Sequence, residues 1–248
     1  GERFGAKDPR SRRFRFHAQT SGVDLTRQQP YNNIARVAVQ AMAGIFGGLQ
    51  SLHTDAFDEA LGSPTATAAR ISVATQNILR YEAHLDDVID PLGGSYYVET
   101  LTAQLVEKSW AFFEEIQTRG GYLACLDSGW LHAKAEENQH KEFMQTESGE
   151  ANIVGVTMAH DDSSPFEIDG FIGTDDAFDV ALERLKEVKR TRHEKGAKTA
   201  LKDLERVCRG SDNIMPVMMD CLEAEATLGE VGDVYREVFG DWRTPIQC

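Results

Sequence analysis

Two short segments near the start of the chain alternate apolar and polar residues, which is the pattern of β-strands. In RRFRFHAQTSG, residues 12–22, the apolar face consists of Phe14, Phe16 and Ala18. The opposite face carries hydrogen-bonding side chains: Arg13, Arg15, His17 and Gln19. In LQSLHTDAFDE, residues 49–59, the polar face consists of Ser51, His53 and Asp55. We therefore predict two strands that are apolar on one face only.

A predicted helix joins these strands and fixes their relative direction. Its apolar residues recur with helical spacing: Ile34, Val37, Ala38, Ala41 and Ile45. The pair Gly47-Gly48 ends the helix, and Thr26 and Gln29 have the spacing of a capping box before it. A strand–helix–strand connection of this length forms a βαβ unit with parallel strands. Because parallel strands are normally covered on both faces, an inward polar face is favoured over the solvated face of an antiparallel sheet.

A second unit of the same kind is predicted next. A helix begins at Ser63-Pro64, with the proline at the first helical position. The short stretch Val88–Asp90 is a candidate for a buried third strand, closed by Pro91. The remaining segments are predicted as helices over about 101–119 and 122–148, a short strand or extended segment over 152–156, a loop over 157–173, and helices over about 174–195, 197–209, 214–227 and 229–239.

Three parallel strands leave two sheet edges unpaired. Either the chain is a small three-stranded α/β domain, or it is the C-terminal part of a (β/α)8 barrel, which needs eight strands. Such a barrel is normally filled with Val, Ile and Leu. Arg, His, Gln and Ser on its inner face would indicate a ligand that runs along the barrel axis.

Charge and cysteine spacing limit the other functional classes. A net charge of −14 and a pI near 4.9 argue against a nucleic-acid or anionic-membrane surface. The four cysteines are scattered, so neither a zinc site nor a disulfide framework is indicated, and His17 and His53 lack a third metal ligand at suitable spacing. We see no signal peptide or apolar run of membrane length, and expect a cytoplasmic protein.

Four long motifs resemble, in order and spacing, the methylmalonyl-CoA mutase family of adenosylcobalamin-dependent acyl-CoA mutases. They are RFHAQTSG, QQPYNNIARVAVQAMA, GGLQSLHTDAFDEALGSPT and DPLGGSYYVE, and the resemblance returns in EANIVGV and MPVMMDCLEAEATLGEVGDVYREVFGDWR. The resemblance implies that residues 1–129 supply about the last three strands of a TIM barrel threaded by coenzyme A. Residues 130–248 would form a mostly helical extension.

The resemblance also implies roles for individual residues. His17 matches a residue that contacts the CoA substrate, and Gln19 matches a polar residue near the reaction centre. Substrate contacts are implied for Gln50 and Ser51, and more loosely for Arg15. Contacts with the adenosyl group are implied for Asp55 and Glu59, while His53 is either a structural hydrogen-bonding residue or a cofactor contact. The family usually has Asn where this chain has Asp55, and Thr157 also departs from its pattern.

The implied activity is a radical 1,2-rearrangement of the carbon skeleton of a CoA thioester, an isomerase reaction. The DxHxxG motif that ligates cobalt in the family is missing, as are the first five barrel strands. We therefore expect a split, heteromeric enzyme: a complementary N-terminal barrel chain and a cobalamin-binding domain or subunit would complete it. The acyl group stays open among methylmalonyl, isobutyryl, ethylmalonyl and 2-hydroxyisobutyryl thioesters. The alternatives are a catalytically inactive structural or regulatory paralogue and an independent small α/β binding domain.

Overall fold

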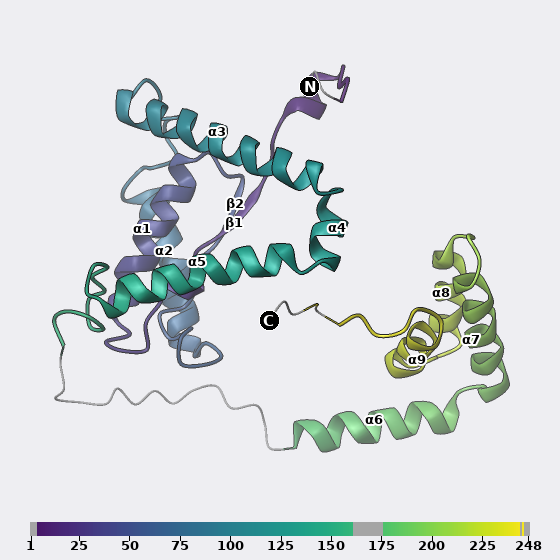
Figure 1. The fold of residues 1–248 in the computed structure, drawn as a ribbon. Coiled ribbons are helices and arrows are strands. Elements are labelled where there is room, and N and C mark those ends of the chain that lie inside the picture. Colours follow the sequence, from purple (N-terminus) through teal and green to yellow (C-terminus); the bar gives the residue numbers. More distant parts are fainter. Residues whose placement is uncertain (1–3, 161–175, 244, 246–248) are drawn as a thin grey trace. The chain divides into compact units, whose positions relative to one another are not determined.

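The structure is a computed structural model that describes residues 4–160, 176–243 and 245. The chain forms two compact units (Figure 1). The first contains the described residues up to 160, and the second contains those from 176 to 245. Each unit has its own hydrophobic core.

The first unit contains the predicted βαβ unit. Strands β1 (His17–Gln19) and β2 (Ser51–His53) are parallel, and helix α1 (Asn32–Phe46) connects them (Figure 1). Short 3-10 helices lie before and after β1, η1 (Pro9–Arg12) and η2 (Gly22–Asp24). The predicted parallel pairing of the two strands is therefore confirmed.

The C-terminus of helix α1 agrees with the sequence prediction, but its N-terminus does not. Gly47 caps its C-terminus as predicted, but the predicted capping box of Thr26 and Gln29 is wrong, because the helix begins after Tyr31. The Thr26 hydroxyl instead donates to the Gln28 carbonyl oxygen at 2.8 Å. The fully buried Asn33 side chain holds this loop, since its amide nitrogen donates to the carbonyl oxygens of Thr26 and Phe57, each at 2.9 Å.

Helix α2 (Ala66–Tyr81) follows β2 and packs against α1. Thr65 is its N-cap and accepts a hydrogen bond from the backbone N–H of Ala68, so the helix starts slightly later than the predicted Ser63-Pro64. Between the two helices lies a small core of Ala56, Phe57 and Ala68, with Ile34 and Ile71 at its edge.

The third strand predicted over Val88–Asp90 is wrong. Val88 is 63% exposed and Ile89 is 96% exposed, so neither side chain is buried in a sheet. Asp90 has a positive φ of 51°, and its carbonyl oxygen accepts a hydrogen bond from Gly93 in a turn. Within the residues that the structure describes, the sheet has two strands. The extended segment predicted over 152–156 is reduced to an isolated parallel bridge between Val154 and Met158.

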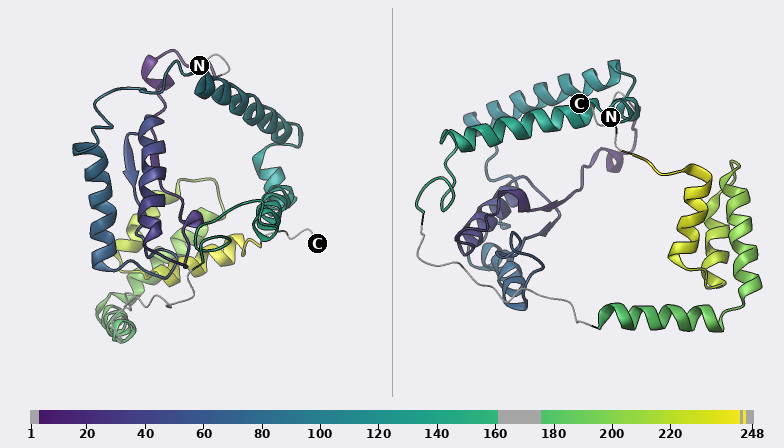
Figure 2. Two further views of the ribbon diagram at one scale, coloured as in Figure 1. Left: turned by 90° about the vertical axis from the view of Figure 1, so that its left-hand side faces the viewer. Right: turned by 60° about the horizontal axis from the view of Figure 1, so that its bottom comes forward.

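Three helices complete the first unit. Helices α3 (Tyr96–Thr118) and α5 (Trp130–Glu147) are long and are joined through the short α4 (Tyr122–Asp127), as Figure 2 shows. Cys125 of α4 is buried, and its thiol donates to the Ile116 carbonyl oxygen at 3.8 Å. The predicted loop at 157–173 lies mostly outside the described residues.

The second unit is helical, as predicted for this region. It consists of α6 (Ala177–Thr191), α7 (Glu194–Cys208), α8 (Ile214–Glu223) and α9 (Leu228–Phe239). The last three helices share a core around Leu204, Cys208, Cys221 and Val231. No helix among the described residues of either unit is sufficiently long and apolar to span a membrane.

Candidate functional site

The polar side chains of β1 and β2 share one exposed face of the sheet. The register places His17 opposite Ser51 and Gln19 opposite His53, and all four residues are exposed. His17 Nδ1 and Ser51 Oγ lie 2.7 Å apart and form a hydrogen bond across the two strands. The strands therefore present a continuous polar surface, as the alternating pattern predicts.

A buried carboxylate lies directly beyond the carboxyl ends of both strands. Asp55 is 2% exposed, and each of its oxygens accepts a hydrogen bond. Gln19 Nε2 donates to Oδ1 at 2.9 Å, and Thr20 Oγ1 donates to Oδ2 at 2.8 Å. The Thr20 hydroxyl in turn accepts from the backbone N–H of Asp55 at 2.8 Å. These bonds tie the end of β1 to the end of β2.

Two further predicted residues lie beside Asp55. His53 Nε2 is 3.8 Å from Asp55 Oδ1, and the His53 side chain is 60% exposed. Gly22, at the start of η2, lies close to both carboxyl-bearing residues, since a Cβ built there would be 3.8 Å from Asp55 Oδ2 and 3.6 Å from Glu59 Cγ. The structure thus brings together Gln19, His53, Asp55 and Glu59.

Gln50 and Arg15 are placed differently. Gln50 Oε1 accepts from the backbone N–H of Phe16 at 2.8 Å, and its Nε2 donates to the Gly48 carbonyl oxygen at 2.7 Å. The amide of Gln50 therefore joins the starts of the strands through the backbone. Arg15 is exposed and precedes β1. Their roles as substrate contacts stay predictions.

The sequence reasoning did not single out Thr20 or the polar network behind β2. Thr54 Oγ1 bonds the Ser72 carbonyl oxygen at 2.9 Å and accepts from Gln76 Nε2 at 2.9 Å, and Ser72 Oγ also donates to the Thr54 carbonyl oxygen. These residues border a cavity of about 180 Å³ that His53 and Glu59 also line. A signal was present for Thr20, because polar residues at the carboxyl end of a parallel strand commonly face a ligand site.

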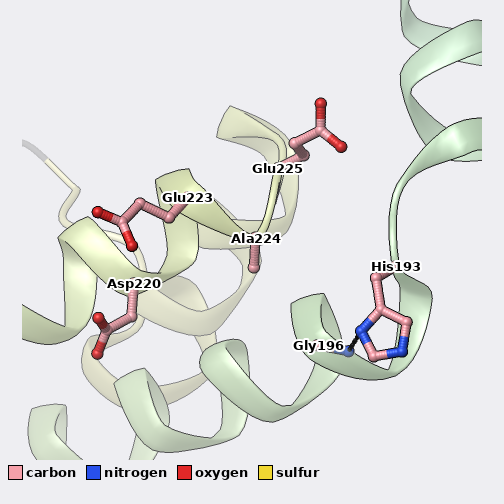
Figure 3. Close-up of a pocket in the computed structure, with 6 residues that line it drawn as sticks. All are labelled: His193, Gly196, Asp220, Glu223, Ala224 and Glu225. Atoms are coloured by element: carbon pink, nitrogen blue, oxygen red, sulfur yellow. Dashed lines mark hydrogen bonds between the residues drawn. The ribbon is translucent and has the colours of Figure 1, made fainter.

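A second cavity, of about 410 Å³, lies in the helical unit (Figure 3). His193 Nδ1 accepts from the backbone N–H of Gly196 at 3.2 Å and thereby caps α7. The carboxylates of Asp220, Glu223 and Glu225 do not converge on His193 or on a common point (Figure 3). Throughout the described ranges, no group of His, Cys, Asp and Glu is arranged to hold a metal ion.

Comparison with known proteins gives consistent matches along the chain. The family model for methylmalonyl-CoA mutase matches residues 1–241. A methylmalonyl-CoA mutase of Cereibacter sphaeroides is 40% identical over 98% of this chain, and one of Escherichia coli is 38% identical over 99%. The 2-hydroxyisobutanoyl-CoA mutase large subunit of Aquincola tertiaricarbonis is 34% identical over 99% of the chain. The chain spans 34% of the length of the first two relatives and 44% of the third.

Proposed function

Because the chain belongs to the methylmalonyl-CoA mutase family, we propose that it forms the C-terminal part of the catalytic barrel of an adenosylcobalamin-dependent acyl-CoA mutase. The observation that carries this proposal is the exposed polar face of a two-stranded parallel sheet whose outer edges have no partner among the described residues. An isolated sheet of this size is marginal in water. A barrel completed by further strands would pair both edges and enclose the polar face.

The proposed substrate is a CoA thioester. His17, Gln19 and Ser51 present neutral donors and acceptors on the sheet face, and these can orient a thioester carbonyl oxygen by hydrogen bonding. His17 is already fixed by Ser51 at 2.7 Å, so its ring is oriented before substrate binds. Arg15 is exposed just before the start of β1 and would contact the CoA part of the substrate. Gln50 would support substrate binding indirectly, because its side-chain amide bonds the backbone at the starts of both strands and holds them in position.

The residues after β2 fit a polar part of the adenosyl cofactor. Asp55 is buried, His53 is exposed and Glu59 borders the same cavity as His53, so three side chains with hydrogen-bonding groups lie beyond the carboxyl ends of the strands. When bound, adenosylcobalamin supplies the radical that starts the rearrangement. His53, Asp55 and Glu59 would hold the adenosyl portion, and the enclosed barrel would exclude water from the reacting groups. The cobalt ligand would come from another domain or chain.

The chain matches about a third of the length of its methylmalonyl-CoA mutase relatives, and the proposed roles of its parts follow from this coverage. Residues 1–129 would complete the barrel, and residues 130–248 would form its helical extension. A complementary N-terminal barrel chain and a cobalamin-binding domain or subunit would supply the remaining parts of a heteromeric enzyme. Which acyl group is rearranged depends on residues of that complementary part.

Reconstitution tests this function. The chain is mixed with a polypeptide covering the remaining two-thirds of a mutase relative, a cobalamin-binding domain and adenosylcobalamin, and four acyl-CoA thioesters are added in turn: methylmalonyl, isobutyryl, ethylmalonyl and 2-hydroxyisobutyryl. We expect Co(II) absorption and isomerised product with one of them, and neither when the chain is omitted. Assembly without Co(II) on any thioester would favour the alternative, an inactive structural or regulatory paralogue. The burial of the Asp55 carboxyl group, at a position where the resemblance implies Asn, is the observation that supports this alternative.

A further inference from the structure

His53 occupies a boundary between the protein interior and the open polar face. Its Nε2 points toward the buried Asp55, 3.8 Å from Oδ1, while the side chain is 60% exposed. Asp55 Oδ1 also accepts a hydrogen bond from Gln19 Nε2 at 2.9 Å. This oxygen atom therefore lies near the last residues of both strands, Gln19 and His53. The imidazole thus has one nitrogen directed at a fixed acceptor and the rest of its ring directed away from it.

The hydrogen bonds of Asp55 come from neutral groups. Gln19 and Thr20 donate to its two oxygens, and neither carries a charge. A buried carboxylate is an acceptor only, and it is stabilised by every N–H that approaches it. In the described part of the chain, the imidazole of His53 lies 3.8 Å from the Asp55 carboxyl group, and this contact is an ion pair only when the imidazole is protonated. An ionised carboxylate cannot donate, so it favours the His53 tautomer whose proton lies on the nitrogen that faces it.

This proton placement determines what the other nitrogen can do. A neutral imidazole with its proton on Nε2 has an unprotonated Nδ1, which accepts a hydrogen bond. The separation of 3.8 Å is longer than a hydrogen bond. Such contacts are often long in ligand-free sites and shorten when the ligand is bound.

We propose that Asp55 is a positioning residue that holds His53 as the Nε2–H tautomer, so that Nδ1 accepts a hydrogen bond from an N–H or O–H group of the bound ligand. Two sources can supply this donor, namely the CoA portion of the substrate and the adenosyl group of the cofactor. The binding role rests on the function proposed above, whereas the tautomer is a property of the chain by itself. Two further side chains with hydrogen-bonding groups line the cavity next to His53, namely Glu59 and, from α2, Gln76.

The tautomer is measured on the full chain with 15N-labelled histidine, by long-range proton–nitrogen correlation at a pH where the imidazole is neutral. His53 is assigned by the signal that His53→Gln removes. We expect a protonated Nε2 and an unprotonated Nδ1 in the wild type and in Glu59→Gln, and loss of this preference in Asp55→Asn, since an Asn amide can turn and donate to the ring. A protonated Nδ1 in the wild type, or an unchanged spectrum in Asp55→Asn, would overturn the proposal.

The ligand contact is measured on the reconstituted complex with coenzyme A and 5′-deoxyadenosine as separate probes. His53→Gln keeps a donor for Asp55 but lacks the Nδ1 acceptor, so we expect roughly tenfold weaker binding of one probe, the effect of one lost hydrogen bond. His53→Asn places an amide oxygen near the Nδ1 position and should restore most of that binding.

Matched controls separate this contact from a general effect of charge. Asp87→Asn alters an exposed pair, His84 Nδ1 and Asp87 Oδ2 at 3.5 Å, and should change neither probe. Unchanged binding of both probes in His53→Gln would refute the ligand contact. If the wild-type complex binds neither probe, the proposed function fails, while the tautomer result on the chain alone still stands.

Discussion

Thr20 shows how one small side chain connects the two strands. Its hydroxyl donates to Asp55 Oδ2 and accepts from the Asp55 backbone N–H, both at 2.8 Å, and Thr20 is 5% exposed. A hydroxyl can do both at once because it is a donor and an acceptor. A residue of similar volume without a hydroxyl would leave two buried polar groups unsatisfied.

We therefore expect Thr20→Val to lower the free energy of unfolding by about 1–3 kcal/mol, measured by urea denaturation followed by circular dichroism. Thr118→Val is the control, because the Thr118 hydroxyl donates to the Glu115 carbonyl oxygen at an exposed position. Equal stability of Thr20→Val and the control would show that the hydroxyl does not hold Asp55.

The alternation of side chains predicted which residues share the sheet face, but not their partners. His17, Gln19, Ser51 and His53 lie where a period of two places them. Gln50 differs, because its amide satisfies backbone groups at the strand starts, a choice that depends on how the two strands meet. The Thr20–Asp55 pair is separated by 35 positions in the chain and follows only from the parallel register.

Helix α9 is anchored to the segment before α7 by a buried ion pair. The Arg192 guanidinium donates to both carboxylate oxygens of Glu230, at 2.6 and 2.7 Å, and its side chain is 4% exposed. Glu230 also completes the capping box of α9 with Thr227. The hydrogen bonds from Arg192 lower the pKa of Glu230 from 4.5 to about 2.

This pKa shift predicts an acid-sensitive helical unit. A carboxyl group whose pKa is lower in the folded state stabilises the fold above its unfolded pKa, and the contribution is lost as the pH falls from about 4.5 toward about 2. We expect Glu230→Gln to lose about 3 kcal/mol at pH 7 and to converge with the wild type near pH 2, measured by urea titrations across this range.

The glutamine of Glu230→Gln can still take part in the capping box of α9, so this substitution tests the loss of the negative charge alone. Asp233→Asn removes an exposed pair with Arg236 and should change stability by no more than a few tenths of a kcal/mol. A constant difference between Glu230→Gln and the wild type from pH 7 to pH 2 would contradict the assignment of the shift to this pair.

Helix periodicity predicted most elements closely and strand propensity predicted one wrongly. Helices α1, α7 and α9 occupy nearly the predicted ranges because their apolar residues face a core. The stretch Val88–Asp90 is predicted as a buried strand but is exposed. Its two consecutive apolar residues are too few to show a period, so the sequence pattern cannot distinguish a strand from a turn here. Likewise, the spacing of Thr26 and Gln29 is that of a capping box, yet the backbone turns at Gln29, where φ is +47°.

The two units differ in how far their own hydrophobic cores can stabilise them. The helical unit has its own core, in which Leu204 and Cys221 are fully buried. The sheet unit, which contains β1 and β2, has a core of Ala56, Phe57 and Ala68 and an exposed polar face. We infer that the helical unit folds without a partner and that the proposed barrel partner adds stability to the sheet unit.

We therefore expect a fragment of residues 173–246 to be helical and to unfold cooperatively on heating, as followed by circular dichroism. The full chain should show that same transition, together with a second, broader one that sharpens when the complementary barrel polypeptide is added. A fragment that loses helicity gradually, without a midpoint, would contradict the independence of the helical unit.

The short parallel pair β1–β2 also has a consequence for how the protein is made in the cell. Unless the proposed barrel strands pair with it, its outer N–H and C=O groups can bind any extended segment, including the same strands of another copy. Newly synthesised chains would then associate wrongly at a rate that rises with their concentration. Coexpression with the complementary polypeptide should therefore raise the recovered yield more than mixing the separately produced chains.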